Sequence, residues 1–388
     1  MQRNALLFVL ISLLSGFGST AMTLAAGIWV FDLTGSVSLA ALTAVCTYAP
    51  TLAAPWLGAL VDRLPRRPLV IGVDLALGAA LLTLLAVRSA GAAWLIFAVL
   101  LARGVSYVLS DAGESAILPS ALSPKILADV NGWRSSAQEG MKLVAPLAGA
   151  TLYAWRGPVA VVVLCAAMPL LTAACYALLR LAPVRPAPQV ERGLRPGLRA
   201  LFGVPAVRDP VLVAGAAIGA SGLTNAAVLA HVVHDLGRPA THLGYLGTAQ
   251  GAGSIVAGLV IGRLLARRGP VTVAAAGAAI FAAGCLLQAL PWWPTMIAGS
   301  VVIGVGLVWA LIAAVTAVQT RTPEHLLGRV AATSNTVMFG PVALGIPLGA
   351  AAVHLGAVVP LALAALVSAA AAAMALRAAR VPSVVSRG

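Results

Sequence analysis

Charged side chains are scarce in this sequence. Of its 388 residues, 25 are Lys or Arg and 11 are Asp or Glu, which is 9% of the chain, whereas roughly a quarter of a soluble protein is charged. This composition excludes a water-exposed surface over most of the chain. The residues present instead are mostly apolar: 61% are hydrophobic, the mean hydropathy is +0.99, and 39 Gly and 24 Pro accompany them. Such a mixture suits closely packed, bent helices in a membrane.

The sequence also lacks the patterns of several kinds of site. Its four cysteines lie in apolar runs without Cys-x-x-Cys spacing, so neither a disulfide framework nor a zinc site is predicted. The phosphate-binding loop of an ATP-driven pump is absent, as are the Asp-rich or His-rich clusters of a membrane enzyme. We therefore expect no enzyme activity, no metal and no cofactor. The net charge of +14 would indicate a nucleic-acid partner only on a water-exposed basic face, so none is predicted.

Twelve apolar stretches are long enough to cross a membrane, because a spanning helix needs about 20 residues to cover some 30 Å of hydrocarbon. They are residues 5–30, 39–61, 69–88, 93–112, 130–153, 157–180, 211–233, 242–265, 270–290, 294–318, 328–353 and 356–377. The first run is too long for a cleaved signal peptide, whose apolar core is about 7–15 residues. The predicted fold class is an all-α membrane protein of twelve transmembrane helices.

The basic residues are distributed unevenly between the predicted loops. With the N-terminus inside, 20 of the 25 face the cytoplasm, Arg88, Arg156 and Arg238 face outside, and Arg103 and Lys142 lie within helices. This asymmetry predicts the orientation, and an even number of spans places both termini in the cytoplasm. Arg outnumbers Lys 23 to 2, which suggests a GC-rich bacterial genome. We expect a multi-pass protein of the bacterial cytoplasmic (inner) membrane.

The longest hydrophilic segment, residues 181–210, contains six Pro and divides the chain. It predicts an N-terminal six-helix bundle (1–180), a cytoplasmic linker (181–210) and a C-terminal six-helix bundle (211–388). A Gly-rich basic turn at 58–68 has a counterpart at 258–270, which indicates an internal duplication.

The first of these turns carries a family signature. It reads Gly58-Ala-Leu-Val-Asp62-Arg63-Leu-Pro65-Arg66-Arg67 and resembles the Gly-x-Leu-x-Asp-Arg-x-Gly-Arg-Arg/Lys turn of the major facilitator superfamily, with Pro65 in place of the usual Gly. The resemblance implies two pseudo-symmetric six-helix bundles, the major facilitator fold. Segments 33–36, 118–131 and 328–349 are similar to the branch of drug and siderophore exporters that includes macrolide-efflux and enterobactin-exporter proteins.

In that superfamily the turn belongs to a latch that holds the two halves in the outward-facing state, and the resemblance implies the same role here. The predicted latch residues are Gly58, Asp62, Arg63, Arg66, Arg67 and Asp111. Asp62 is expected to meet the start of the eleventh span, and Asp111 to pair with an arginine of the turn. The alternative is that these arginines only orient the protein.

Three charged side chains lie deep in predicted spans. Arg103 is near mid-membrane, where an unpaired cation costs at least roughly 2.5–3.5 kcal/mol. It resembles the fourth-helix Arg that the superfamily's second motif links to proton transfer, although Tyr107 stands where that motif has Gly. Proton coupling or a substrate-facing role is predicted for Arg103, with a structural polar contact as the alternative. Glu139 and Lys142 share a helix face and either form a structural ion pair or leave Glu139 to carry a proton.

Pro146 and Gly149 keep part of the Gly-Pro-rich run of the fifth helix in drug/proton antiporters, and they predict a bend with close packing. Asn225, Gln250 and Trp309 are candidate substrate-cavity residues, and interhelical hydrogen bonding is the alternative for each.

Two further groups of polar residues are expected near the interfaces. Asp74 and Glu114 are expected to be solvated or paired at the cytoplasmic side. His231, His234 and His242 cluster at the outer side, where interfacial polar contact is favoured over metal binding or pH sensing.

These observations predict a secondary active transporter that exports an amphipathic small organic molecule, such as an antibiotic, drug or siderophore-like metabolite, in exchange for protons by alternating access. The scarcity of mid-membrane charge favours a substrate with apolar surface. A facilitator or importer of a small metabolite, or a non-transporting membrane receptor, are the alternatives. The expected partners are the small-molecule substrate, protons as the coupling ion and the lipid bilayer, and the protein is expected to be a monomer.

Overall fold

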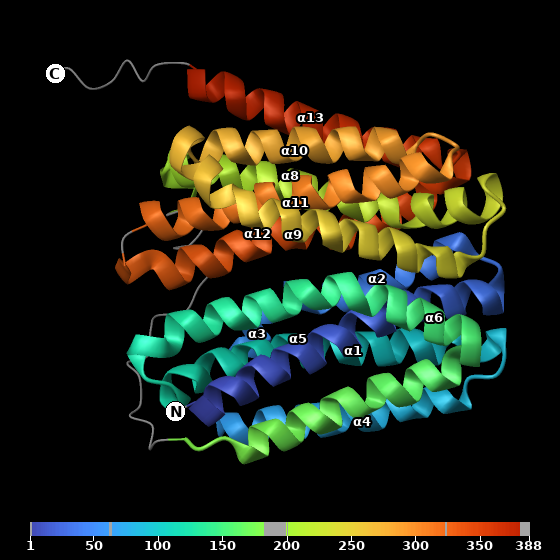
Figure 1. Cartoon of the computed structure of the whole chain (residues 1–388), viewed down its shortest axis with the longest axis horizontal. Coiled ribbons are helices and arrows are strands. Elements are labelled where there is room, and N and C mark those ends of the chain that lie inside the picture. The colour runs from blue at the N-terminus through green and yellow to red at the C-terminus, as the bar shows by residue number, and fades with distance from the viewer. Residues whose placement is uncertain (1, 62–63, 182–198, 200, 323, 381–388) are drawn as a thin grey trace. The chain divides into compact units, whose positions relative to one another are not determined.

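The structure is a computed structural model that describes residues 2–61, 64–181, 199, 201–322 and 324–380 (Figure 1). Its described residues form helices and turns, with no β-strand among them. The chain divides into two compact units: unit 1 is Met1–Gln189 with Arg238–Thr248, and unit 2 is Val190–Gly237 with Ala249–Gly388. Most of the predicted linker, at 182–198 and 200, lies outside the described residues, so the predicted domain boundaries stay a prediction.

Unit 1 is built from helices that pack in pairs. α1 packs against α2 and α6, α4 against α5 and α6, and α2 and α3 against α5. The short turns η1, η2 and η4 and the beginning of α9 (Leu243–Arg268) complete the unit. The elements are α1 (Gln2–Thr34), α2 (Val37–Leu52), α3 (Ala54–Val61), α4 (Arg66–Thr83), η1 (Leu84–Ala86), η2 (Ala90–Ala92), α5 (Ala93–Ala121), α6 (Pro124–Leu178) and η4 (Ala240–His242).

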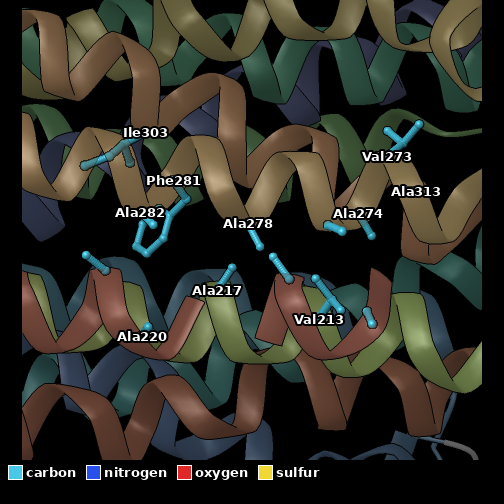
Figure 2. Close-up of a cluster of buried hydrophobic side chains, with 14 of the residues drawn as sticks. Val213, Ala217, Ala220, Val273, Ala274, Ala278, Phe281, Ala282, Ile303 and Ala313 are labelled. Carbon is cyan, nitrogen blue, oxygen red and sulfur yellow. The ribbon is translucent and has the colours of Figure 1, made fainter. Parts of the chain in front are cut away.

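Unit 2 has α10 at the centre of its core, packed against α8, α11 and α13, while α12 packs against α8. Figure 2 shows this core, in which Ala278 and Phe281 of α10 lie opposite Ala217 and Ala220 of α8. The elements are α8 (Pro205–Ala230), the π-helical turn η3 (His231–Asp235), α9 (Leu243–Arg268), α10 (Pro270–Gln288), α11 (Trp293–Arg321), α12 (Glu324–Ala352), η5 (Val353–Leu355) and α13 (Val358–Arg380).

The helices confirm the predicted all-α membrane fold. Ten helices of the described residues are long and apolar enough to cross a membrane, and Val37–Leu52 is a shorter apolar helix that α3 continues. One of the ten, Ser136–Leu178, contains the non-helical residue Gly157 (φ 74, ψ −174) and therefore holds two spans. A positive φ favours glycine, and Pro158 follows directly, so the predicted boundary at 153–157 has a local cause.

The predicted single span 39–61 is wrong in one detail, because it is broken at Ala53 into α2 and α3. The Ala53 N–H donates to the carbonyl oxygens of Pro50 and Thr51, so the chain tightens instead of continuing an α-helix. Pro50 and Pro55 flank the break, and neither offers a backbone N–H to the preceding turn.

Glycines let the helices approach closely in both units. In unit 2, a Cβ on Gly345 of α12 would lie 2.5 Å from the carbonyl oxygen of Gly219 on α8, and one on Gly304 of α11 would lie 2.0 Å from the carbonyl oxygen of Gln250 on α9. Contacts this short exclude any larger residue. The Gly-rich composition therefore serves backbone-to-backbone packing of the kind that membrane helices use.

Candidate functional site

One end of unit 1 collects the start of α1, the start of α4 and the ends of α5 and α6. The Asn4 side chain of α1 donates to the carbonyl oxygens of Ala121 (2.9 Å) and Arg180 (2.8 Å), and Arg67 donates to the carbonyl of Ala177. Cations and amide donors at these positions satisfy carbonyls that a helix C-terminus leaves unpaired. We call this region the basic end of unit 1 and define it by Arg3, Arg66, Arg67, Arg134 and Arg180.

The predicted latch residues are only partly described. Asp62 and Arg63 lie outside the described residues, Gly58 lies on α3, and Arg66 and Arg67 begin α4. Asp111 is exposed on α5 and interacts electrostatically with Arg134 of α6. The structure thus places a basic neighbour of Asp111 on α6, and the predicted pairing of Asp111 with an arginine of the turn stays a prediction. The latch itself stays a prediction.

Arg103 of α5 lies inside unit 1, with 6% of its surface exposed. Its Nη1 donates to the carbonyl oxygen (3.1 Å) and hydroxyl (2.6 Å) of Ser19 on α1. Its Nη2 donates to the hydroxyls of Thr23 on α1 (2.6 Å) and Thr47 on α2 (3.1 Å). Nε is buried without a hydrogen-bond partner. Within the described ranges no Asp or Glu forms an ion pair with this guanidinium, so its charge is held by neutral oxygens alone.

Local sequence explains how these groups meet. Ser19 and Thr23 are four residues apart on α1 and therefore share a face. Gly104 follows Arg103, and a Cβ there would lie 2.6 Å from the carbonyl oxygen of Cys46 and 2.9 Å from that of Thr47. The missing side chain thus lets α5 approach α2 closely enough for Arg103 to reach Thr47. The result is a buried cation where three helices cross.

Two carboxyl groups, Asp74 and Glu114, are buried in the same unit. Asp74 of α4 is 7% exposed and accepts a hydrogen bond from the hydroxyl of Thr172 on α6 (2.6 Å). Glu114 of α5 is 9% exposed and pairs with Arg134 (2.9 Å). The expected pairing of Glu114 is thus present, whereas the expectation that Asp74 is solvated or paired at the rim is wrong. The part of α6 after Gly157 covers this face of α4, since Thr172 contacts Asp74 and a Cβ on Gly78 would meet Leu170.

The first part of α6 carries two predicted pairs of residues, the charged pair Glu139 and Lys142 and the helix-bend pair Pro146 and Gly149. The Glu139 side chain lies outside the described residues, and Lys142 is exposed. Gly149 packs on α1, since a Cβ there would lie 3.1 Å from Cβ of Ala21. Pro146 is buried, and a Cβ on Gly247 of α9 would lie 2.8 Å from its Cβ. Close packing is therefore present here, while the residue of α6 with non-helical backbone angles is Gly157.

The candidate cavity residues of unit 2 are dispersed over three helices. Asn225 is exposed on α8 and donates to the carbonyl oxygen of Gly222 in its own helix (3.3 Å). Gln250 is exposed on α9. The Trp309 indole of α11 donates to the carbonyl oxygen of Ala257 on α9 (3.3 Å), which is the interhelical contact named as its alternative role.

Sequence reasoning missed an apolar groove of about 640 Å³ along α6. Its lining consists of Leu143, Val144, Leu147, Ala148, Thr151, Leu152, Trp155 and Thr248. The Thr248 hydroxyl donates to the carbonyl oxygen of Leu143 (2.9 Å). The positions 143, 147, 151 and 155 recur every fourth residue, so the one-sided pattern of this helix was a signal that could have found the groove.

The fold and these buried groups define a polytopic helical membrane protein with ionisable side chains inside its helical bundles. The sequence model of the Major Facilitator Superfamily matches residues 8–224 and 211–388. The chain belongs to this family and is therefore a multi-pass secondary transporter of a small molecule, not an enzyme.

Individual relatives agree with this assignment. Macrolide efflux protein A of Streptococcus pyogenes is 27% identical over 138 residues, which are 35% of this chain and 34% of that protein; the match thus spans about a third of the relative. The nucleoside transporter NupG superposes with a TM-score of 0.73 at 15% identity, covering 97% of this chain and 98% of the other. A bacterial homologue of the iron transporter ferroportin gives 0.70 at 16%, covering 97% and 99%. At these identities the two structures show the fold alone.

Proposed function

We propose that this transporter exports an amphipathic small organic molecule of the antibiotic, drug or siderophore type in exchange for protons. The partial relationship to a macrolide efflux protein supports export of such a compound. The groove along α6 is lined almost entirely by apolar side chains and supports a substrate with apolar surface.

The observation that carries the antiport proposal is the buried Arg103 with its neutral partners. A cation without a counter-ion in a low-dielectric interior makes a positive potential around it. A proton and a cationic substrate each add positive charge near Arg103 and repel one another, so unit 1 favours holding one of them at a time. Alternating access combined with mutually exclusive binding gives exchange of one for the other.

The proposed orientation in the membrane rests on the basic residues at the basic end of unit 1. We assign the basic end of unit 1 to the cytoplasm of a bacterial inner membrane, with both chain termini on that side, because basic residues are retained inside. The latch at Gly58–Arg67 and Asp111, the Glu139–Lys142 pair and the monomeric state belong to the same proposal.

Transport in everted vesicles tests this function, with a radiolabelled macrolide as the probe. Wild type is expected to accumulate the probe when the lumen is acidic, and Arg103→Met to lose this accumulation. Arg103→Lys keeps the positive charge but not the forked donors of the guanidinium, and this variant is expected to retain part of the accumulation. Arg88→Met, which removes an exposed Arg, is the matched control and should behave as wild type.

Other outcomes would change the assignment. Equilibration that ignores the pH gradient would indicate a facilitator, and accumulation only in right-side-out vesicles would indicate an importer. Binding of the probe by purified protein without movement across the membrane would indicate a receptor. Full pH-driven accumulation by Arg103→Met would refute the role given to Arg103.

A further inference from the structure

The hydroxyl of Thr172 lies between two acceptors. It is 2.6 Å from Oδ2 of Asp74 and 2.9 Å from the carbonyl oxygen of Pro169. A threonine hydroxyl has one proton and donates only one hydrogen bond at a time, although its oxygen also accepts. If Asp74 is ionised, both neighbours of Thr172 are acceptors and one contact is unsatisfied. If Asp74 carries a proton, its O–H donates to Thr172 and Thr172 donates to Pro169, so both contacts are complete.

Burial also favours the protonated state of Asp74. Asp74 is 7% exposed and Thr172 is 2% exposed, and no Lys or Arg of the described residues forms an ion pair with Asp74. An ionised carboxylate away from water needs a cation or several donors, and Thr172 supplies one donor. Asp74 comes eight positions after Arg66, the first residue of α4, which places it about 12 Å along the helix at 1.5 Å per residue.

Titratable groups connect Asp74 with the basic end of unit 1. On α6, Tyr176 follows Thr172 by one helical turn and interacts electrostatically with Asp74, Glu114 and Arg134. On α5, Glu114 pairs with Arg134 through Oε2, while its Oε1 is buried without a hydrogen-bond partner. Asp111 interacts with Arg134 and Glu114. The Tyr176 hydroxyl also hydrogen-bonds to the Glu114 carboxylate, so Tyr176 and Glu114 offer neighbouring groups for a proton on its way between Asp74 and that end.

We propose that Asp74 is the site where the exchanged proton binds, with Glu114 and Tyr176 as its route to the basic end of unit 1. Binding forms an O–H bond on the Asp74 carboxylate and turns the Thr172 hydroxyl to Pro169. Release breaks that bond and turns the hydroxyl back to Asp74. This inference rests on the proposed proton antiport and names the residue that carries the proton.

The protonation state of Asp74 is measured independently of any substrate. Infrared difference spectra of the full-length protein in lipid, recorded over a pH series, show the C=O stretch of protonated carboxylic acids. We expect such a band in wild type and in Asp32→Asn, and its loss in Asp74→Asn. Asp32 is the matched control, since it also accepts one hydroxyl bond, from Tyr153 (2.7 Å), but is exposed. Thr172→Val should shift the band, because it removes the hydrogen-bond partner.

Three spectroscopic outcomes would overturn the inference. In the first, the band persists unchanged in Asp74→Asn. In the second, the band disappears in Glu114→Gln and not in Asp74→Asn, which would place the proton on Glu114. Loss of the band on adding Na⁺ at constant pH would mean that the carboxyl binds a metal cation.

Transport provides the second readout. At one proton per substrate, each pH unit drives about tenfold accumulation, since a pH unit is about 1.4 kcal/mol. Wild type and Asp32→Asn are expected to approach this ratio in everted vesicles, and Asp74→Asn to equilibrate at a ratio near one. Asp74→Asn that accumulates like wild type refutes the inference and leaves the antiport proposal intact. No response of wild type to the pH gradient refutes antiport, while the infrared band still decides whether Asp74 holds a proton.

Discussion

The contact between α5 and α2 at Gly104 gives the sharpest prediction of the structure. A Cβ at this position would lie 2.6 Å from the carbonyl oxygen of Cys46, where ordinary contact begins at 3.4 Å. Gly104→Ala must therefore separate the two helices by about 0.8 Å. The hydrogen bond from Arg103 to Thr47, now 3.1 Å, would lengthen to about 3.9 Å and be lost.

The expected cost has two parts. Overpacking costs about 1–3 kcal/mol, and loss of one hydrogen bond to a charged group costs about 1.5–3 kcal/mol. The two overlap, because the same displacement causes both, so we expect the free energy of unfolding to fall by about 2–4 kcal/mol. The bonds from Arg103 to Ser19 and Thr23 on α1 should survive, so transport should be reduced but not abolished.

Thermal unfolding in detergent measures this effect through a fluorescent thiol reagent that reacts with Cys165, Cys175 and Cys285, which are buried in the folded protein. Gly72→Ala on α4 is the matched control, since a Cβ there meets nothing within 4 Å. Its unfolding temperature should stay equal or rise, because Ala is the better helix former by about 1 kcal/mol. Equal unfolding temperatures and equal transport for Gly104→Ala and Gly72→Ala would refute the close α5–α2 contact.

Three further changes test other buried contacts. Asn4→Ala removes the amide that joins α1 to α5 and α6 and should lower the free energy of unfolding by about 1–3 kcal/mol, measured by thermal unfolding; an unchanged value would mean that water replaces the amide. The Gln288 amide donates to the hydroxyl of Ser300 (2.8 Å), so Ser300→Ala alone should cost about 1–3 kcal/mol, whereas adding Gln288→Met should restore most of that loss. Tyr153→Phe removes a hydrogen bond to an exposed carboxylate and should change stability by less than about 1 kcal/mol with normal transport; a large loss would mean that this end of unit 1 is held by that bond.

Much of the fold was predictable because the bilayer imposes a strong requirement. Backbone groups in hydrocarbon must be paired within the segment, so long apolar runs become helices whatever their neighbours are. The boundary at Gly157 was predictable for the same reason, since Gly-Pro interrupts an apolar run that is twice the length of one span. The break at Ala53 was not predicted, because a Pro inside an apolar run either bends a helix or ends it, and tertiary packing decides between the two.

The candidate site was less predictable, because it depends on which faces meet. Arg103 stood out as a charge in an apolar run, but its partners Ser19, Thr23 and Thr47 are ordinary residues of membrane helices. Their role depends on the crossing of three helices, which no local pattern specifies. Asp74 was misjudged for a related reason: its distance from the helix end is readable from the sequence, but whether another helix covers its face is not.

The buried polar residues are distributed unequally between the two units of this duplicated fold. Among the described residues, unit 1 buries the ionisable groups Asp74, Arg103 and Glu114, whereas the buried polar residues of unit 2 are His231 and neutral Gln, Ser and Thr side chains. Small residues and close backbone contacts line the helix crossings of unit 2. Each buried charge costs several kcal/mol in a membrane, so the presence of Asp74, Arg103 and Glu114 together in unit 1 agrees with the proton exchange that we propose for this unit.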